Sequence, residues 1–252
     1  QRQMCIRDRL CDVHSALFHG SATDAQKLHA KDIQDQRLSA AAALIQISGH
    51  PLQTFTLENA ALEKLIARAR QALENNGITD ELLDELRQIA IHYARKGDLL
   101  YPHLKVQYGI SGPSAVMWTV DDEIRDELNA LAKQKDQKET DAWKQRLNAV
   151  LTRMEEMIYK ESNILFPNCA LNFSEEEWYH IYRDAKDYAE CFGIRSDSWQ
   201  AAEAHLADTA STADTLSVEH AFADGETRIH LPGGSLTLSQ LTAMLNTIPL
   251  EI

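Results

Sequence analysis

HYARKGDLLYP at residues 92–102 and MIYKESNILFP at residues 157–167 align without gaps, and each ends in an aromatic residue followed by proline. Two earlier stretches also match, ENAAL at residues 58–62 and VDDEI at residues 120–124. We interpret these matches as a duplicated helix pair, in which each half of a bundle contributes inward-facing side chains. The alternative is that two amphipathic hairpins resemble one another through composition alone.

Apolar residues recur at helical spacing on both sides of these stretches. The 10 glycines and 6 prolines fall largely between the periodic segments, which is typical of helices joined by short connections. The spacing predicts four long amphipathic helices, at about residues 52–75, 80–98, 114–134 and 140–165. Four such helices of similar length predict an all-α protein built on an antiparallel four-helix bundle.

Further segments are expected at both ends of the bundle. Further helices are predicted at residues 9–19, 22–46 and 175–191. The last of these begins with a capping box formed by Ser174 and Glu177. Residues 193–226 are acidic and weakly patterned, which predicts a linker, and residues 227–231 are typical of a short strand.

The net charge of the chain limits the classes of molecule that it can be expected to bind. The chain has 25 Lys and Arg against 38 Asp and Glu residues, a net charge of −13. This argues against nucleic-acid binding and against attachment to an anionic membrane. We find no apolar stretch long enough for a transmembrane helix and no secretory signal. Four scattered cysteines without a CxxC pair predict reduced thiols, so we expect a cytoplasmic protein.

The motifs of several enzyme classes are missing. The sequence contains no GxGxxG, GxSxG or HExxH pattern and no phosphate-binding P-loop. No pair of nucleophile and base stands out, so an oxidase or peroxidase is the least favoured hypothesis and we expect no enzymatic activity.

Several stretches taken together resemble one known family. The two repeat ends and the segments RLCDVHSALF, GHPLQTFTLEN and VMWTVDDEIR resemble the hemerythrin-like (HHE cation-binding) family. More narrowly, they resemble a bacterial family of unknown function in which a hemerythrin-like bundle precedes a PAS sensor domain. The stretch LPGGSLTLSQLTAMLNTIPLEI at residues 231–252 resembles the beginning of that PAS domain.

The resemblance and the helix pattern together predict six segments along the chain. They are a non-native scar at residues 1–8, an N-terminal helical segment at 9–49, a hemerythrin-like four-helix bundle at 50–170, an additional helix at 171–192, an acidic linker at 193–228 and the truncated start of a PAS domain at 229–252.

The resemblance implies a metal site of His and carboxylate side chains inside the bundle, the donor set that suits iron. The candidate metal ligands are His14, His50, Glu58, His92, Asp121 and Glu161, and Asn59 and Met157 are candidate cofactor contacts. His14 and His50 lie outside the four helices and are expected to close the open end of the bundle.

This chain departs from the family pattern at several of those positions. Asn59 and Met157 stand where the family has histidines, and His92 is followed four residues later by Lys96. A complete di-iron set in the usual register is therefore absent.

Three functions follow as hypotheses. The first is a sensory module whose non-haem iron binds O2 or NO, or changes redox state, and relays the change to the PAS domain. The second is a haem sensor, with His14, His50, His92 and Met157 as axial candidates. The third is a metal-free scaffold for interaction, dimerisation or signal relay. A homodimer fits the first and the third.

Overall fold

The computed structural model describes residues 24–75, 77–110, 112–213, 218–219, 228–231 and 234–237. The chain divides into two compact units, Gln1–Gln200 and Ala201–Ile252. The predicted scar, the predicted helix at residues 9–19 and His14 lie outside the described residues, as does most of the predicted PAS segment. No helix in the described ranges is both long and apolar enough to cross a lipid bilayer.

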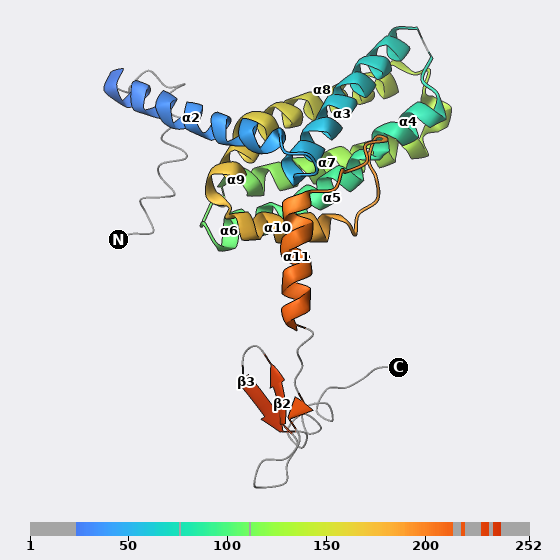
Figure 1. Ribbon diagram of the computed structural model, residues 1–252. Helices are drawn as coiled ribbons and strands as arrows, with labels where there is room; N and C mark the ends of the chain where they lie inside the picture. The colour runs from blue at the N-terminus through green and yellow to red at the C-terminus, as the bar shows by residue number, and fades with distance from the viewer. Residues whose placement is uncertain are drawn as a thin grey trace. The chain divides into compact units, whose positions relative to one another are not determined.

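Four helical segments pack around one apolar core in the first unit (Figure 1). They are α3 (Pro51–Glu74), the consecutive helices α4 (Asp80–Arg87) and α5 (Ile89–Leu99), α7 (Gly112–Lys133) and α8 (Asp141–Lys160). Helix α3 packs against α8 and α4, and α7 packs against the same two partners. The predicted helices are confirmed, with a break at Gln88 that divides the second one.

The apolar spacing in the sequence explains which faces meet in this core. The buried side chains include Phe55, Leu62, Ile66, Leu83, Leu86, Ile124, Leu128, Trp143, Leu147 and Met154. Several helix ends are closed by side chains that the sequence marks as caps. Thr79 accepts a hydrogen bond from the Leu82 N–H, and Thr140 accepts one from the Trp143 N–H.

Each repeat ends in a break of the helix near its proline. Helix α5 stops at Leu99 and α6 (Tyr101–Val106) continues after it, with Pro102 in its first turn. Helix α8 passes through a π-helical turn, η2 (Glu161–Leu165), into α9 (Phe166–Asn172). Single π turns within helices are frequent at functional sites, because they redirect side chains.

The break before Pro167 is also where the N-terminal helix docks. Proline has no N–H to donate to the Asn163 carbonyl one turn earlier. The Gln34 side chain donates to that carbonyl instead, at 2.9 Å. Gln34 belongs to α2 (Asp24–Ile45), which packs against α9 and α3 (Figure 1).

A 3-10 turn lies within the bundle, and shorter elements follow it. The turn η1 (Lys135–Gln137) joins α7 to α8, and α10 (Glu175–Ala185) follows α9. The predicted capping box at Ser174 and Glu177 is confirmed, whereas α10 ends earlier than the predicted residue 191.

The predicted linker differs most from the structure. Helix α11 (Gln200–Ala213) occupies much of it, and the weak apolar pattern of this segment did not predict a helix there. Alanine-rich composition supports a helix even where no amphipathic pattern marks it. In the second unit, strands β1 (Val218–Glu219), β2 (Arg228–Leu231) and β3 (Gly234–Thr237) form an antiparallel sheet in the order β1-β2-β3, which confirms the predicted strand.

Gly49 controls the entry of the chain into α3. Its φ of +78° lies in the left-handed region, and a Cβ there would approach the backbone N of Trp199 to 2.5 Å and the carbonyl O of Asp197 to 2.6 Å. Gly109 also has a positive φ, +66°, but a Cβ there would meet no atom within 4 Å. A side chain at either glycine would therefore strain the backbone, but only one at Gly49 would also clash with neighbouring atoms.

We expect Gly109→Ala to lower the free energy of unfolding by roughly 1–2 kcal/mol, through strain alone. Gly49→Ala should cost about 3 kcal/mol or more, because the added methyl group also forces two backbone segments apart. Urea unfolding followed by circular dichroism measures both losses. Equal losses in the two variants would contradict the predicted clash.

Candidate functional site

A cluster of charged side chains lies in the middle of the bundle core. Helix α3 supplies Glu58 and Asn59, α5 supplies His92, Arg95 and Lys96, α6 supplies Tyr101, α7 supplies Asp121, and the first residue of η2 is Glu161. All are buried, and Glu58, His92 and Lys96 have no exposed surface. Burial of so many charges is tolerable only when they are paired and hydrogen-bonded.

Lys96 lies between two carboxylates from the other half of the bundle. Its Nζ donates to Asp121 Oδ1 at 2.9 Å and to Glu161 Oε1. The Tyr93 ring lies 4.2 Å from the same nitrogen, a distance at which an aromatic face attracts a cation. The Tyr101 hydroxyl donates to the remaining Asp121 oxygen, Oδ2, at 3.0 Å. Both Asp121 oxygens therefore accept hydrogen bonds, and burial raises the pKa of this carboxyl group although Lys96 acts in the opposite direction.

His92 bridges the two remaining carboxylates. Its Nδ1 lies 2.7 Å from Glu58 Oε2, and its Nε2 lies 3.1 Å from Glu161 Oε2. Both neighbours are acceptors, so both ring nitrogens donate and the ring is an imidazolium. Burial by itself would lower the pKa of His92, but the charges of Glu161 and Glu58 outweigh it and raise that pKa to about 9.

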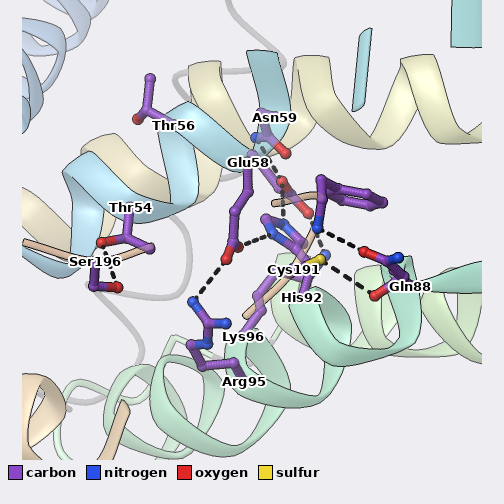
Figure 2. A network of polar contacts seen from close by, with 12 residues as sticks. Thr54, Thr56, Glu58, Asn59, Gln88, His92, Arg95, Lys96, Cys191 and Ser196 are labelled. Atoms are coloured by element: carbon purple, nitrogen blue, oxygen red, sulfur yellow. Dashed lines mark hydrogen bonds and ion pairs between the residues drawn. The ribbon is translucent and has the colours of Figure 1, made fainter. Parts of the chain in front are cut away.

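Arg95 and Asn59 hold two carboxylates of the cluster from opposite sides (Figure 2). Arg95 Nη1 donates to Glu58 Oε1 at 2.8 Å, and Asn59 Nδ2 donates to Glu161 Oε2 at 2.8 Å. Burial raises the pKa of Glu161, but Lys96 and His92 lower it more strongly, to about 2. The carboxylate therefore stays ionised throughout the neutral range.

Charge and hydrogen bonding balance within this cluster, which we call the core ion network. It contains three carboxylates (Glu58, Asp121, Glu161) and three cations (His92, Arg95, Lys96), so its net charge is zero. Each of the six carboxylate oxygens accepts a hydrogen bond from a protein donor. The carboxylates of this buried network are therefore fully hydrogen-bonded, and such networks favour one arrangement of the core.

The order of the helices, their breaks near Pro102 and Pro167, and the buried carboxylates are features that can be compared with known proteins. Residues 50–169 match the hemerythrin HHE cation binding domain. The match covers the four helical segments and both repeat ends, and it confirms the resemblance seen in the sequence at the level of that domain. No curated protein matches the chain.

An HHE domain implies a bound metal, but the side chains present here do not fit one. Lys96 Nζ bridges two carboxylates from within the core, and neither His92 nitrogen has a lone pair free for a metal. Among the described residues, no three His, Cys, Asp or Glu side chains are arranged so that they would hold an ion. A divalent ion would also add uncompensated charge to a neutral, buried cluster.

The structure brings together five of the predicted site residues, in a role other than metal ligation. Glu58, Asn59, His92, Asp121 and Glu161 all belong to the core ion network. The three carboxylates among them pair with cations of the protein, and this explains how a bundle without the full di-iron set buries them.

The other candidates have separate positions. His50 is the N-cap of α3: its Nδ1 accepts the Leu52 N–H at 3.1 Å, and its ring packs between Trp178 and Trp199. Burial lowers the pKa of His50 to about 3, so the ring is neutral. Met157 is fully buried among the apolar core side chains.

The candidate set omitted Lys96 and Arg95, although the sequence allowed Glu161 to pair with Lys160 or Lys96, and the structure shows the Lys96 pair. The repeat alignment contains a signal for Lys96, because it pairs Lys96 with Glu161 and Asn59 with Asp121. A charge reversal between equivalent inward positions is what two halves need in order to neutralise one another. The sequence has no equivalent signal for Arg95, because its contact with Glu58 depends on how α5 is rotated against α3.

The pH dependence of stability tests the charge on His92. Its folded pKa of about 9 exceeds the ordinary value of 6.5, so its contribution is complete below about pH 6.5 and is lost as the pH rises through about 9. We expect the free energy of unfolding to fall by up to about 3 kcal/mol across that window. Denaturant titrations at about pH 6 and about pH 10 measure the loss.

A matched variant isolates this effect from other alkaline titrations. His92→Gln keeps hydrogen-bonding capacity but has no proton to lose, so its stability should change much less over the same window. Parallel curves for the variant and the natural chain would show that His92 is neutral in the folded protein.

Proposed function

We propose that the HHE-type bundle is a metal-independent regulatory module in which the ammonium group of Lys96 takes the place of a bound cation. The observation that supports this is the complete use of the carboxylates: all six oxygens accept bonds from the protein, and the network is neutral. The bundle keeps the acidic interior of a cation-binding domain and supplies its own positive charge.

Metal binding would have to overcome this internal pairing. Metal ligands must be deprotonated, and His92 with a pKa of about 9 would lose its proton at a cost of about 3 kcal/mol near pH 7. The metal would also have to displace Lys96 from Asp121 and Glu161, leaving a buried ammonium without partners. Both costs favour the network over the metal.

The regulatory part of the proposal rests on the organisation of the chain. The bundle precedes a second unit that contains antiparallel strands, and the sequence of that unit resembles the beginning of a PAS domain. We propose that the bundle relays its conformation to such a domain, as a non-enzymatic cytoplasmic protein and with homodimers as one route of relay.

Iron remains the second candidate, because one observation favours it. Residues 50–169 match a cation-binding domain, and four oxygen or nitrogen donor residues of the predicted set lie together in the core. In that case the bundle would bind a non-haem iron centre and sense a small diatomic ligand.

Metal analysis and absorption spectroscopy on the full chain, purified without added metal, test the proposal. The melting temperature is then measured with Fe²⁺, Mn²⁺, Zn²⁺ or haem added, since a ligand that binds only the folded state raises it. We expect neither stoichiometric metal nor any rise. Stoichiometric iron would establish the iron sensor, and a Soret band would establish a haem sensor.

A further inference from the structure

A pocket of about 200 Å³ lies next to the core ion network, at the beginning of α3. Its polar lining comes from both sides of the bundle: Thr54 on α3, Arg95 on α5, Lys186 after α10, and the segment Ser196–Ser198. All of these residues belong to the first unit. The size suits a molecule of only a few heavy atoms.

Arg95 connects this pocket to the network. It lines the pocket while only 4% of its surface is exposed, and its Nη1 holds Glu58 (Figure 2). Nη2 donates to the Ala189 carbonyl at 3.2 Å, and Nε has no hydrogen-bond partner among the described residues. A buried polar atom without a partner costs free energy, which a ligand can recover.

One edge of the guanidinium consists of Nε, which has no partner among the described residues, and Nη2, which also donates to the Ala189 carbonyl. Nε and Nη2 point the same way and form the two-donor fork that binds a carboxylate or phosphate in parallel hydrogen bonds. Glu58 uses only Nη1, so an anion on the other edge need not displace it. The neighbouring hydroxyl groups of Thr54 and Ser196, 3.1 Å apart, are further polar contacts.

The charge of the lining selects among anions. Arg95 and Lys186 are cationic, and Asp197, which accepts a hydrogen bond from Ser48 at 2.9 Å, adds one negative charge. Arg95 is already paired with Glu58, so the charges at the pocket balance, and a monovalent ligand adds less uncompensated charge than a divalent phosphate.

We propose that this pocket binds a small carboxylate through the Nε–Nη2 edge of Arg95, and that the core ion network responds to it. The bound carboxylate would compete with Glu58 for the positive charge of Arg95, which weakens the Arg95–Glu58 ion pair. The Glu58–His92 and His92–Glu161 hydrogen bonds would then change in length. The inference extends the proposed function by naming the class of molecule to which the bundle responds.

The test is calorimetric titration of the full chain with acetate, pyruvate and L-alanine, with inorganic phosphate and chloride at matched ionic strength as comparisons. We expect saturable binding of at least one carboxylate, weaker binding of phosphate and none of chloride. Absence of saturable binding by all three carboxylates, or tighter binding of phosphate, overturns the proposal.

Two variants locate the site without removing the charge beside Glu58. Arg95→Lys keeps a cation but lacks the fork, and Ala185→Leu places a larger side chain in the pocket lining. Each should weaken carboxylate binding about tenfold or more, equivalent to about 1.4 kcal/mol. Lys64→Met, at an exposed lysine outside this pocket, is the matched control. Unchanged binding in both variants would place the carboxylate elsewhere.

Metal content is measured on the same preparations, which keeps the two proposals separable. Carboxylate binding by an iron-loaded protein would overturn only the metal-independent core. If the protein is metal-free and does not bind a carboxylate, only the proposal of a carboxylate site in the pocket is wrong.

Discussion

Lys96→Met is expected to lower the free energy of unfolding by about 3–5 kcal/mol at pH 7, the typical cost of removing one partner from a buried ion pair. The substitution keeps most of the side-chain volume, so the loss comes from charge. Asp121 and Glu161 would remain buried without the ammonium that neutralises them. Urea unfolding followed by circular dichroism measures the change.

The same substitution at an exposed lysine shows how much of the loss comes from replacing lysine with methionine and how much from removing the buried charge. Lys64 is exposed, so Lys64→Met should change stability by no more than about 0.5 kcal/mol. Adding Glu161→Gln to Lys96→Met should recover part of the loss, because it removes one unpaired carboxylate. A loss below about 1 kcal/mol in Lys96→Met would mean that the ammonium is not the counterion of this core.

Lys96→Ala is expected to convert the bundle into a protein that binds a divalent cation. The truncation removes the ammonium and opens space between Asp121 and Glu161, and His92 can give up its Nε2 proton to complete an N/O donor set. At a metal concentration of about 100 times Kd, the gain in stability is about 2.7 kcal/mol. Thermal unfolding with and without Mn²⁺, Fe²⁺ or Zn²⁺ measures it.

Two controls test whether this metal-dependent gain in stability arises from the side chains around position 96. The natural chain should show no metal-dependent stabilisation, and Lys96→Ala combined with Asp121→Asn should lose most of it. If Lys96→Ala ignores all three metals, Lys96 does not take the place of a cation, and the proposed origin of the metal-independent core is wrong.

Much of the fold is encoded locally. The helix at residues 52–75 was predicted from the spacing of Phe55, Leu62 and Ile66, and the same side chains are buried in α3. Capping residues such as Ser174 mark their helix ends through contacts within three residues. Such features depend on neighbours in the chain, so the sequence is enough to find them. Where the local pattern is weak, as in α11, the helix was not predicted.

The candidate site was predicted in part for the same reason. Glu58, His92, Asp121 and Glu161 follow from the repeat and from the resemblance to a metal-binding bundle, which identify inward positions. Their chemical role does not follow, because a carboxylate ready for metal and a carboxylate paired with lysine have the same sequence signature.

The amino-acid sequence is enough to predict the helices, the duplicated half-motif and the acidic residues that enter the core. The contacts of Lys96 with Glu161, 65 residues away, and of His92 with Glu58, 34 residues away, follow from the packing of the folded chain. These contacts depend on how α5 is rotated against α3, α7 and η2, which is set by the packing of all four segments together. The charge balance of the core ion network is therefore a property of the folded bundle, because only folding brings its three cations and three carboxylates within bonding distance.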